Sequence, residues 1–278
     1  MLIEILKALL IGVIEGITEW LPISSSTHIE LAAALCKTDV TTPFFRLFEV
    51  VIQLGAILAV IILYWGRLFP WAPKEKARRS RVWGLWLRIV IAAVPAAVIG
   101  FLIDDWRDEH LDRFPVKAAM LILYGALFIV IERWHAKKPA GETVPEAEDL
   151  TNPGAVKIGL FQLLSLVPGT SRSGATILGG MLTGVSRKAA AEFSFFLAIP
   201  VMLGASLLKT AKYIAEYGLA FSGTEIAVLV TGVLSAFAVS MLCLRALVGY
   251  LKTHSFEVFG WYRIVLGLLV AFLAIRGL

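Results

Sequence analysis

The sequence predicts an all-α polytopic membrane protein with six transmembrane helices, two re-entrant helical hairpins and an inverted-topology repeat. The first observation is composition: 58% of the 278 residues are hydrophobic and 17% are charged, and the mean hydropathy is +0.81. The second is that several apolar stretches reach the roughly 20 residues that a bilayer-spanning helix needs. The third is that two further apolar stretches are interrupted by polar turns. Together these features exclude a soluble domain.

Six uninterrupted apolar stretches predict the transmembrane helices. They cover residues 44–65, 83–103, 116–134, 190–208, 224–245 and 256–276. The stretches 1–38 and 155–186 each carry a polar turn with proline and glycine near the middle. Such a turn is tolerated at membrane depth only where protein or a wet cavity surrounds it. We therefore expect both to be re-entrant hairpins.

The charges in the loops predict the orientation. The loop at 66–82 is basic, whereas the loop at 104–113 is mainly acidic. Because basic loops stay in the cytoplasm, the first loop is expected inside and the second outside. The net charge of +5 is spread over short loops, which argues against a nucleic-acid partner. Cys36 and Cys243 have no metal-site spacing and are expected to pack.

The polar segment 136–154 predicts a flexible cytoplasmic connector between two halves, 1–135 and 155–278, of a single membrane domain. GVIEGITEWLPISSS in the first half resembles GLFQLLSLVPGTSRS in the second. Each half is a hairpin followed by three spans. Because three is odd, the second half is expected upside down relative to the first, as in many transporters. The two hairpin turns are expected to meet near the midplane and share one polar site.

Polar residues cluster in the first hairpin, where EGITEWLPISSSTH combines two carboxylates with hydroxyls and a histidine. Glu15 and Glu19 are four residues apart and share a helix face. Charges inside a membrane segment need a partner or a task. Their task is expected to be binding Mg²⁺ or Ca²⁺, which take oxygen ligands. The structural alternative is that both merely pair with Arg172 across the hairpins.

The second turn has the composition of a phosphate site. Arg172 is expected to fork onto two phosphate oxygens, and glycine and hydroxyl residues around it offer further donors. The alternative is an arginine that snorkels to the interface. The expected substrate-binding residues of the two turns are Ser24, Ser26, Thr27, Gly169, Thr170, Ser171, Arg172 and Ser173.

His28 follows four hydroxyl residues, so it is expected either to activate a hydroxyl or to act on phosphorus itself; a core histidine is the alternative. Glu49 and Gln53, also four apart, are expected to extend the polar face, with a helix–helix hydrogen bond as the other interpretation. Spacing leaves these choices open.

Three segments together resemble the undecaprenyl-diphosphate phosphatase family of the bacitracin-resistance type. They are EGITEWLPISSSTH, FEVVIQLGAILAV and the stretch that begins PGTSRSGATILGG. The resemblance covers nearly the whole chain. It implies metal-dependent hydrolysis of undecaprenyl diphosphate, a phosphoric anhydride, with Glu15 and Glu19 as the acidic pair and Ser25, His28 and Arg172 as the reactive serine, histidine and arginine. Thr27 departs from the family pattern, which often has Gly or Ala before the histidine.

The resemblance also implies a place in the cell. The substrate is a membrane lipid, the protein lies in the bacterial inner membrane, and the active site faces the periplasm. The lipid carrier is recycled for peptidoglycan synthesis, which underlies bacitracin resistance. The expected mechanism is attack by Ser25 assisted by His28, with direct water attack as the competing version. A lipid-phosphate transporter using the same midplane site is the alternative function, and a homodimer is left open.

Overall fold

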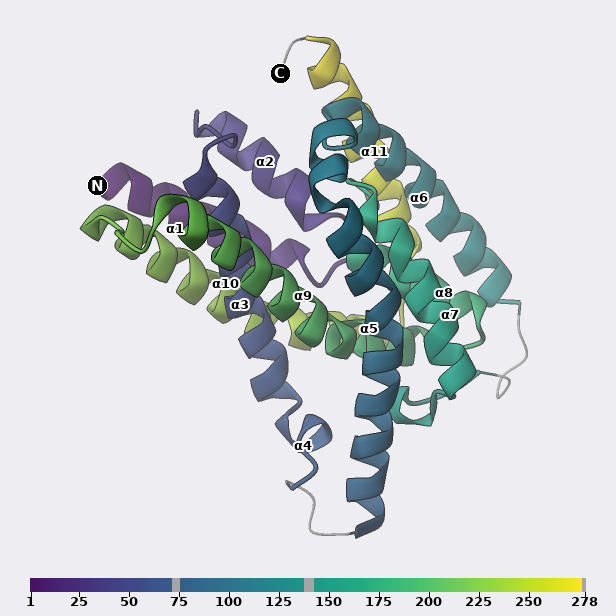
Figure 1. The fold of residues 1–278 in the computed structure, drawn as a ribbon. Helices are drawn as coiled ribbons and strands as arrows, with labels where there is room; N and C mark the ends of the chain where they lie inside the picture. The colour runs from purple at the N-terminus through teal and green to yellow at the C-terminus, as the bar shows by residue number, and fades with distance from the viewer. Residues whose placement is uncertain (72–75, 138–142, 277–278) are drawn as a thin grey trace. The chain divides into compact units, whose positions relative to one another are not determined.

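The computed structural model describes residues 1–71, 76–137 and 143–276 (Figure 1). In these ranges the regular structure is helical, apart from one isolated bridge between Val144 and Val185. Among the described residues, six helices contain a segment long and apolar enough to cross a membrane, which confirms the six predicted spans. They are α3 (Pro43–Leu63), α5 (Lys76–His110), α6 (Phe114–His135), α9 (Arg187–Tyr217), α10 (Gly223–Tyr250) and α11 (Glu257–Ile275).

Helix α5 is longer than its predicted span because its flanking charged segments are also helical. It has 35 residues, which at 1.5 Å each gives a length of about 50 Å. The apolar part of a bilayer is only about 30 Å thick. The polar segments 76–82 and 104–110, expected in loops, therefore continue the helix beyond the apolar part, and that expectation was wrong.

Both interrupted stretches form two helices that pack against each other and are joined by a polar turn. The first stretch contains α1 (Leu2–Thr18) and α2 (Ser25–Leu35). The second contains α7 (Asn152–Leu163), the short 3-10 helix η2 (Leu164–Leu166) and α8 (Arg172–Leu182). The helix–turn–helix part of the prediction is thus confirmed. The re-entrant placement of these pairs and the inverted repeat stay predictions.

The chain divides into two compact units, called unit 1 and unit 2 below. Unit 1 consists of Met1–Trp20, Ser25–Leu63 and Ala198–Ala246, and unit 2 of Leu21–Ser24, Tyr64–Leu197 and Leu247–Leu278. Each unit takes segments from both halves of the sequence. The short segment Leu21–Ser24, between α1 and α2, belongs to unit 2, although both of those helices belong to unit 1.

In unit 1, α1 packs closely on α10 through glycines. A Cβ atom at Gly16 would lie 2.8 Å from the carbonyl oxygen of Ala236 and 2.8 Å from Cβ of Val239. At Gly12 it would lie 2.6 Å from the carbonyl oxygen of Gly232. Small residues allow helix backbones to approach in this way in membrane proteins. The close packing positions the C-terminal turn of α1, which carries both glutamates of interest.

Replacing Gly16 by valine is expected to destabilise the protein by about 1–3 kcal/mol, because the added side chain meets backbone atoms that cannot move away. Thermal unfolding in detergent measures the change. The matched control is Gly204→Ala in α9, where an added Cβ has nothing within 4 Å. An unfolding temperature for Gly16→Val equal to that of the control would contradict the close packing.

In unit 2, α6 and α11 run side by side (Figure 1). Their contact is also built on glycine: a Cβ at Gly125 would lie 2.7 Å from the carbonyl oxygen of Gly260. Helix α7 packs against α5, where Gly159 lies against the backbone of Ala92. These contacts hold α11 and α7 firmly beside the second polar turn.

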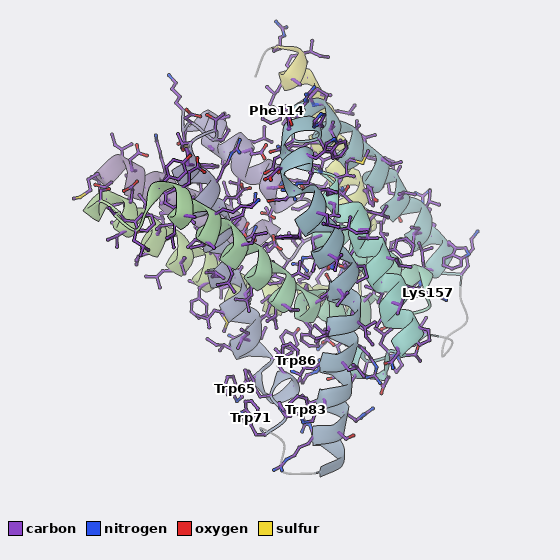
Figure 2. The ribbon with its side chains drawn as sticks, in the orientation of Figure 1. Trp65, Trp71, Trp83, Trp86, Phe114 and Lys157 are labelled. Carbon is purple, nitrogen blue, oxygen red and sulfur yellow. The ribbon has the colours of Figure 1, made fainter. Side chains whose placement is uncertain are left out.

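Tryptophan residues gather around α4 (Trp65–Leu68) and the first turns of α5 in unit 2, as Figure 2 shows. Trp65, Trp71 and Trp83 are exposed, whereas the indole nitrogen of Trp86 donates to the carbonyl oxygen of Leu68 at 2.6 Å. Tryptophan is enriched where a membrane protein crosses the membrane–water interface. This end of unit 2 has the composition of such an interface.

The described part of the connector is anchored to unit 2 through Arg67. The Arg67 guanidinium contacts Glu148 at 2.6 Å, Glu192 at 2.9 Å and Glu146 at 3.5 Å. Burial alone would raise the pKa of Glu148, but the hydrogen bond and charge of Arg67 outweigh it and hold that pKa below its ordinary value. The expected flexibility of the connector stays a prediction; residues 138–142 lie outside the described residues.

Candidate active site

The two carboxylates of the first motif lie at the end of α1, within unit 1. The backbone N–H of Glu19, which caps the helix, donates to the carbonyl oxygen of Glu15 at 3.0 Å. The two side chains are thus one helical turn apart, as predicted. Glu15 is fully buried and Glu19 is 7% exposed. Carboxylates in such apolar surroundings interact strongly with a bound cation or a nearby proton donor.

Ser25 is the first residue of α2, and its hydroxyl donates to Oε2 of Glu19 at 2.6 Å. A short O–H···O⁻ bond of this kind is charge-assisted. The bond places a proton acceptor, the Glu19 carboxylate, beside the Ser25 hydroxyl, which is the arrangement that makes a serine nucleophilic. The sequence predicted a histidine in this role, because His28 is close in sequence. In the structure Ser25 bonds Glu19, across the turn, and the role predicted for His28 stays a prediction.

The remaining residues of the first motif lie on α2. His28 is one turn along from Ser25 and half-buried, so it shares the Ser25 face of the helix. Ser26 is half-buried and Thr27 fully buried. The roles predicted for these three stay predictions.

Helix α3 carries the two residues expected to support the site. Glu49 and Gln53 are both half-buried and one turn apart. Their spacing is that of a shared helix face. A supporting role for them also stays a prediction.

The second polar turn lies in unit 2 and begins α8. Ser171 caps the helix, because its hydroxyl accepts from the backbone N–H of Gly174 at 3.1 Å. Ser171 has a φ of 72°, a left-handed conformation that costs a serine about 1–3 kcal/mol and is typical of functional sites. Ser171 and Ser173 are also in hydroxyl–hydroxyl contact at 3.1 Å.

Arg172, the first residue of α8, is anchored to α9. Its Nη1 donates to the backbone carbonyl of Ser194 at 2.7 Å and contacts the Ser194 hydroxyl at 3.3 Å. That hydroxyl also bonds Thr176 at 2.7 Å. A guanidinium is a rigid planar group, so fixing one nitrogen orients the whole fork. These bonds anchor the arginine to α9 within unit 2.

The segment Leu21–Ser24 is tied to the second turn inside unit 2. The Ser173 hydroxyl donates to the carbonyl oxygen of Leu21 at 3.2 Å. Ser24 is buried and has a φ of 73°. Like Ser171, it is a left-handed serine directly before an 11-residue helix. In both turns, therefore, the serine that directly precedes the helix has a positive φ. Gly169, with a φ of 88°, and Thr170 are buried, and Gly169 lies against the backbone of Lys117 in α6.

Sequence reasoning missed Arg263, which lies in α11 and is fully buried. Its guanidinium donates to backbone carbonyls of both turns: Pro22 at 2.8 Å, Gly169 at 2.9 Å and Thr170 at 2.9 Å. The signal that could have found it is an arginine within the last apolar stretch. Charged residues inside membrane helices are energetically costly and usually have a structural or functional role.

The donor set of the first motif fits a Mg²⁺ ion. Among the residues that the structure describes, no three His, Cys, Asp or Glu side chains are grouped to hold a metal by themselves. Mg²⁺ does not need such a cage, because it is usually bound through one or two carboxylates together with substrate phosphates and waters. Glu15 and Glu19 supply two carboxylates on one helix turn.

The fold and these two turns define a class: a multi-pass helical membrane protein with buried acid, hydroxyl and arginine side chains. Comparison with known proteins identifies the family. A family model described as Bacitracin resistance protein BacA matches residues 8–269. The chain belongs to this family.

Relatives match over nearly their full length. An undecaprenyl-diphosphatase of Enterococcus faecalis is 51% identical over 271 residues, 96% of each chain. One from Acetivibrio thermocellus is 48% identical over 279 residues, 99% of this chain and 100% of the relative. Undecaprenyl-diphosphatase 1 of Oenococcus oeni is 47% identical over 280 residues, 100% of this chain and 99% of the relative.

Proposed function

We propose that the protein hydrolyses undecaprenyl diphosphate to undecaprenyl phosphate and inorganic phosphate, and so recycles the lipid carrier for cell-wall synthesis. The family and the names of the relatives support the reaction and the substrate. The observation that carries the chemistry is the 2.6 Å bond between the Ser25 hydroxyl and the Glu19 carboxylate. Resistance to bacitracin fits the family description.

The proposed first step is attack by Ser25 on the terminal phosphorus. The Oγ–P bond forms while the bridging P–O bond of the anhydride breaks, and its electron pair leaves with undecaprenyl phosphate. The proton of Ser25 passes to Glu19, which already accepts its hydrogen bond. Phosphoryl transfer needs mainly positioning and neutralisation of charge, so a single activated hydroxyl suffices as nucleophile.

The proposed second step is hydrolysis of the phosphoserine. Water attacks phosphorus, the P–Oγ bond breaks, Glu19 returns its proton to Oγ of Ser25, and inorganic phosphate is released. His28, on the Ser25 face of α2, is proposed to accept the proton of the water. Direct attack by water on the substrate, with His28 as base, is the competing route. The two routes differ in whether a phosphoenzyme forms.

The charges of the diphosphate are proposed to be met by Arg172 and by a divalent cation. Arg172 would bind two oxygens of the terminal phosphoryl group through its planar fork, and the hydroxyls of the two turns would donate to the others. Glu15 and Glu19 would hold Mg²⁺ or Ca²⁺. A bound cation would neutralise charge that develops on the phosphate oxygens.

We propose that the site opens to the outside of the inner membrane. The support is the distribution of charge in unit 2: the α4–α5 end carries the exposed Arg78, Arg79 and Arg81, whereas the other end of α5 carries Asp104, Asp105 and Asp108. Under the positive-inside rule the basic end is cytoplasmic.

Phosphate release by purified protein in detergent tests the function. Undecaprenyl diphosphate is expected to give stoichiometric phosphate with Mg²⁺, and an excess of EDTA is expected to lower the rate at least about 100-fold, because metal ions supply several kcal/mol of charge stabilisation. Restoring Mg²⁺ should restore the rate. A folded protein that releases no phosphate under any condition would contradict the proposal and favour a lipid-phosphate transporter, which needs two compartments to act.

A further inference from the structure

Arg263 is a fully buried arginine near the middle of the transmembrane helix α11. A charge at this depth is unfavourable unless the protein offers it partners. Among the residues that the structure describes, no carboxylate forms an ion pair with Arg263. Its partners are backbone carbonyl oxygens and the ring of Tyr124, whose centroid is 5.7 Å from the guanidinium carbon. Arg263 is therefore not one half of a salt bridge.

The two terminal nitrogens of Arg263 hold different segments. Nη1 donates to the carbonyl oxygen of Pro22 at 2.8 Å. Nη2 donates to the carbonyl oxygens of Gly169 and Thr170, each at 2.9 Å, and lies 3.4 Å from that of Met120 in α6. One guanidinium thus connects three parts of unit 2 that are far apart in sequence. The rigid fork fixes the distance between the segment that contains Pro22 and the turn that contains Gly169 and Thr170.

The bonded carbonyls directly precede the functional groups of the two turns. Pro22 lies two residues before the strained Ser24 and three before Ser25, which begins α2. Thr170 lies one residue before the strained Ser171 and two before Arg172, which begins α8. Left-handed serines persist only where their surroundings impose them. The bonds from Arg263 supply that constraint on both turns.

We infer that Arg263 is a positioning residue for the reaction, acting through the backbone of both turns. It is fully buried, so it acts without touching substrate. Within unit 2 it fixes the backbone of the segment that precedes Ser25 and of the turn that precedes Arg172. This inference rests on the proposed function for its kinetic consequence, but its structural content is independent of the substrate.

The test compares Arg263→Lys and Arg263→Met with Arg276→Met, a control at the exposed end of the same helix. Lysine keeps the charge, but its single nitrogen cannot replace both arms of the fork. With undecaprenyl diphosphate and Mg²⁺, kcat of Arg263→Lys is expected to fall about 100-fold, the cost of a displacement of about 1 Å at a reacting group. KM is expected to change less than about threefold, because Arg172 itself is retained.

Hydrogen exchange measured by mass spectrometry on the same samples separates positioning from general loosening. Arg263→Lys is expected to speed exchange in peptides that cover 20–26 and 168–174, and to leave peptides of α6 and the rest of α11 unchanged. Wild-type kcat and wild-type exchange in both turns would overturn the inference. So would faster exchange spread throughout unit 2, which would mark a purely structural residue.

The design keeps the inference apart from the proposed function. If the wild-type protein releases no phosphate, the proposed function fails while the exchange measurement still decides the role of Arg263. If Arg263→Met does not fold, both the kinetics and the hydrogen exchange are measured on Arg263→Lys alone. An Arg276→Met variant with the same local exchange change as Arg263→Lys would also overturn the inference.

Discussion

Replacing Arg172 by alanine is expected to lower kcat/KM for undecaprenyl diphosphate by at least about 1,000-fold, the contribution that arginines make to phosphoryl transfer. The guanidinium neutralises charge on the transferred group and matches two of its oxygens at once. Its anchor on the Ser194 carbonyl in α9 fixes the orientation of the fork. The measurement is phosphate release at several substrate concentrations.

Arg172→Lys is expected to lose about 10- to 100-fold, because lysine restores the charge without the fork. Arg245→Ala, at an exposed position of α10, controls for the general loss of a positive charge and should keep wild-type activity. An Arg172→Ala enzyme within about tenfold of wild type would remove Arg172 from the mechanism and leave a structural role, the bond to α9.

The second large effect is expected at the pair formed by Ser25 and Glu19. Ser25→Ala is expected to lower kcat by at least about 1,000-fold, since it removes the nucleophile, and Glu19→Gln by about 100- to 10,000-fold, since it removes the proton acceptor. Groups that act as a unit are not additive. The double variant should therefore be no slower than Ser25→Ala alone. Single-turnover phosphate release measures all three variants.

The matched control is Glu30→Gln, another half-buried carboxylate on α2. It should behave as wild type. A Ser25→Ala enzyme with near-normal turnover would exclude the phosphoserine route and leave direct attack by water. Additive losses in the double variant would contradict the coupling between Ser25 and Glu19.

The fold was largely predictable because the membrane imposes simple rules. Runs of about 20 apolar residues have one stable structure in a bilayer, and all six such runs are helices with membrane-spanning segments. The proline- and serine-rich interruptions were predictable as breaks for similar reasons. The extension of α5 was not, because its charged ends lie outside the apolar run that hydropathy detects.

The site was predictable in its composition but not in its pairings. The sequence offered His28 as a group that could activate a hydroxyl, but its spacing left the choice of role open. The observed partner of Ser25, Glu19, is reached through a turn that contains a left-handed Ser24, a conformation that serine rarely adopts. Arg67 and the connector are paired over about 80 residues for a similar reason: long-range ion pairs leave no local pattern.

The Arg263 contacts also bear on the order in which this protein is made. The donor to the carbonyl oxygen of Pro22 is Arg263, which is synthesised 241 residues later. During translation the first hairpin can leave the ribosome and enter the membrane long before its turn is held in place. Contacts between such distant residues form late in folding. A nascent chain therefore lacks the Arg263 bonds to both turns until α11 has been made, so a chain that ends just before α11 has most of its spans but not these bonds.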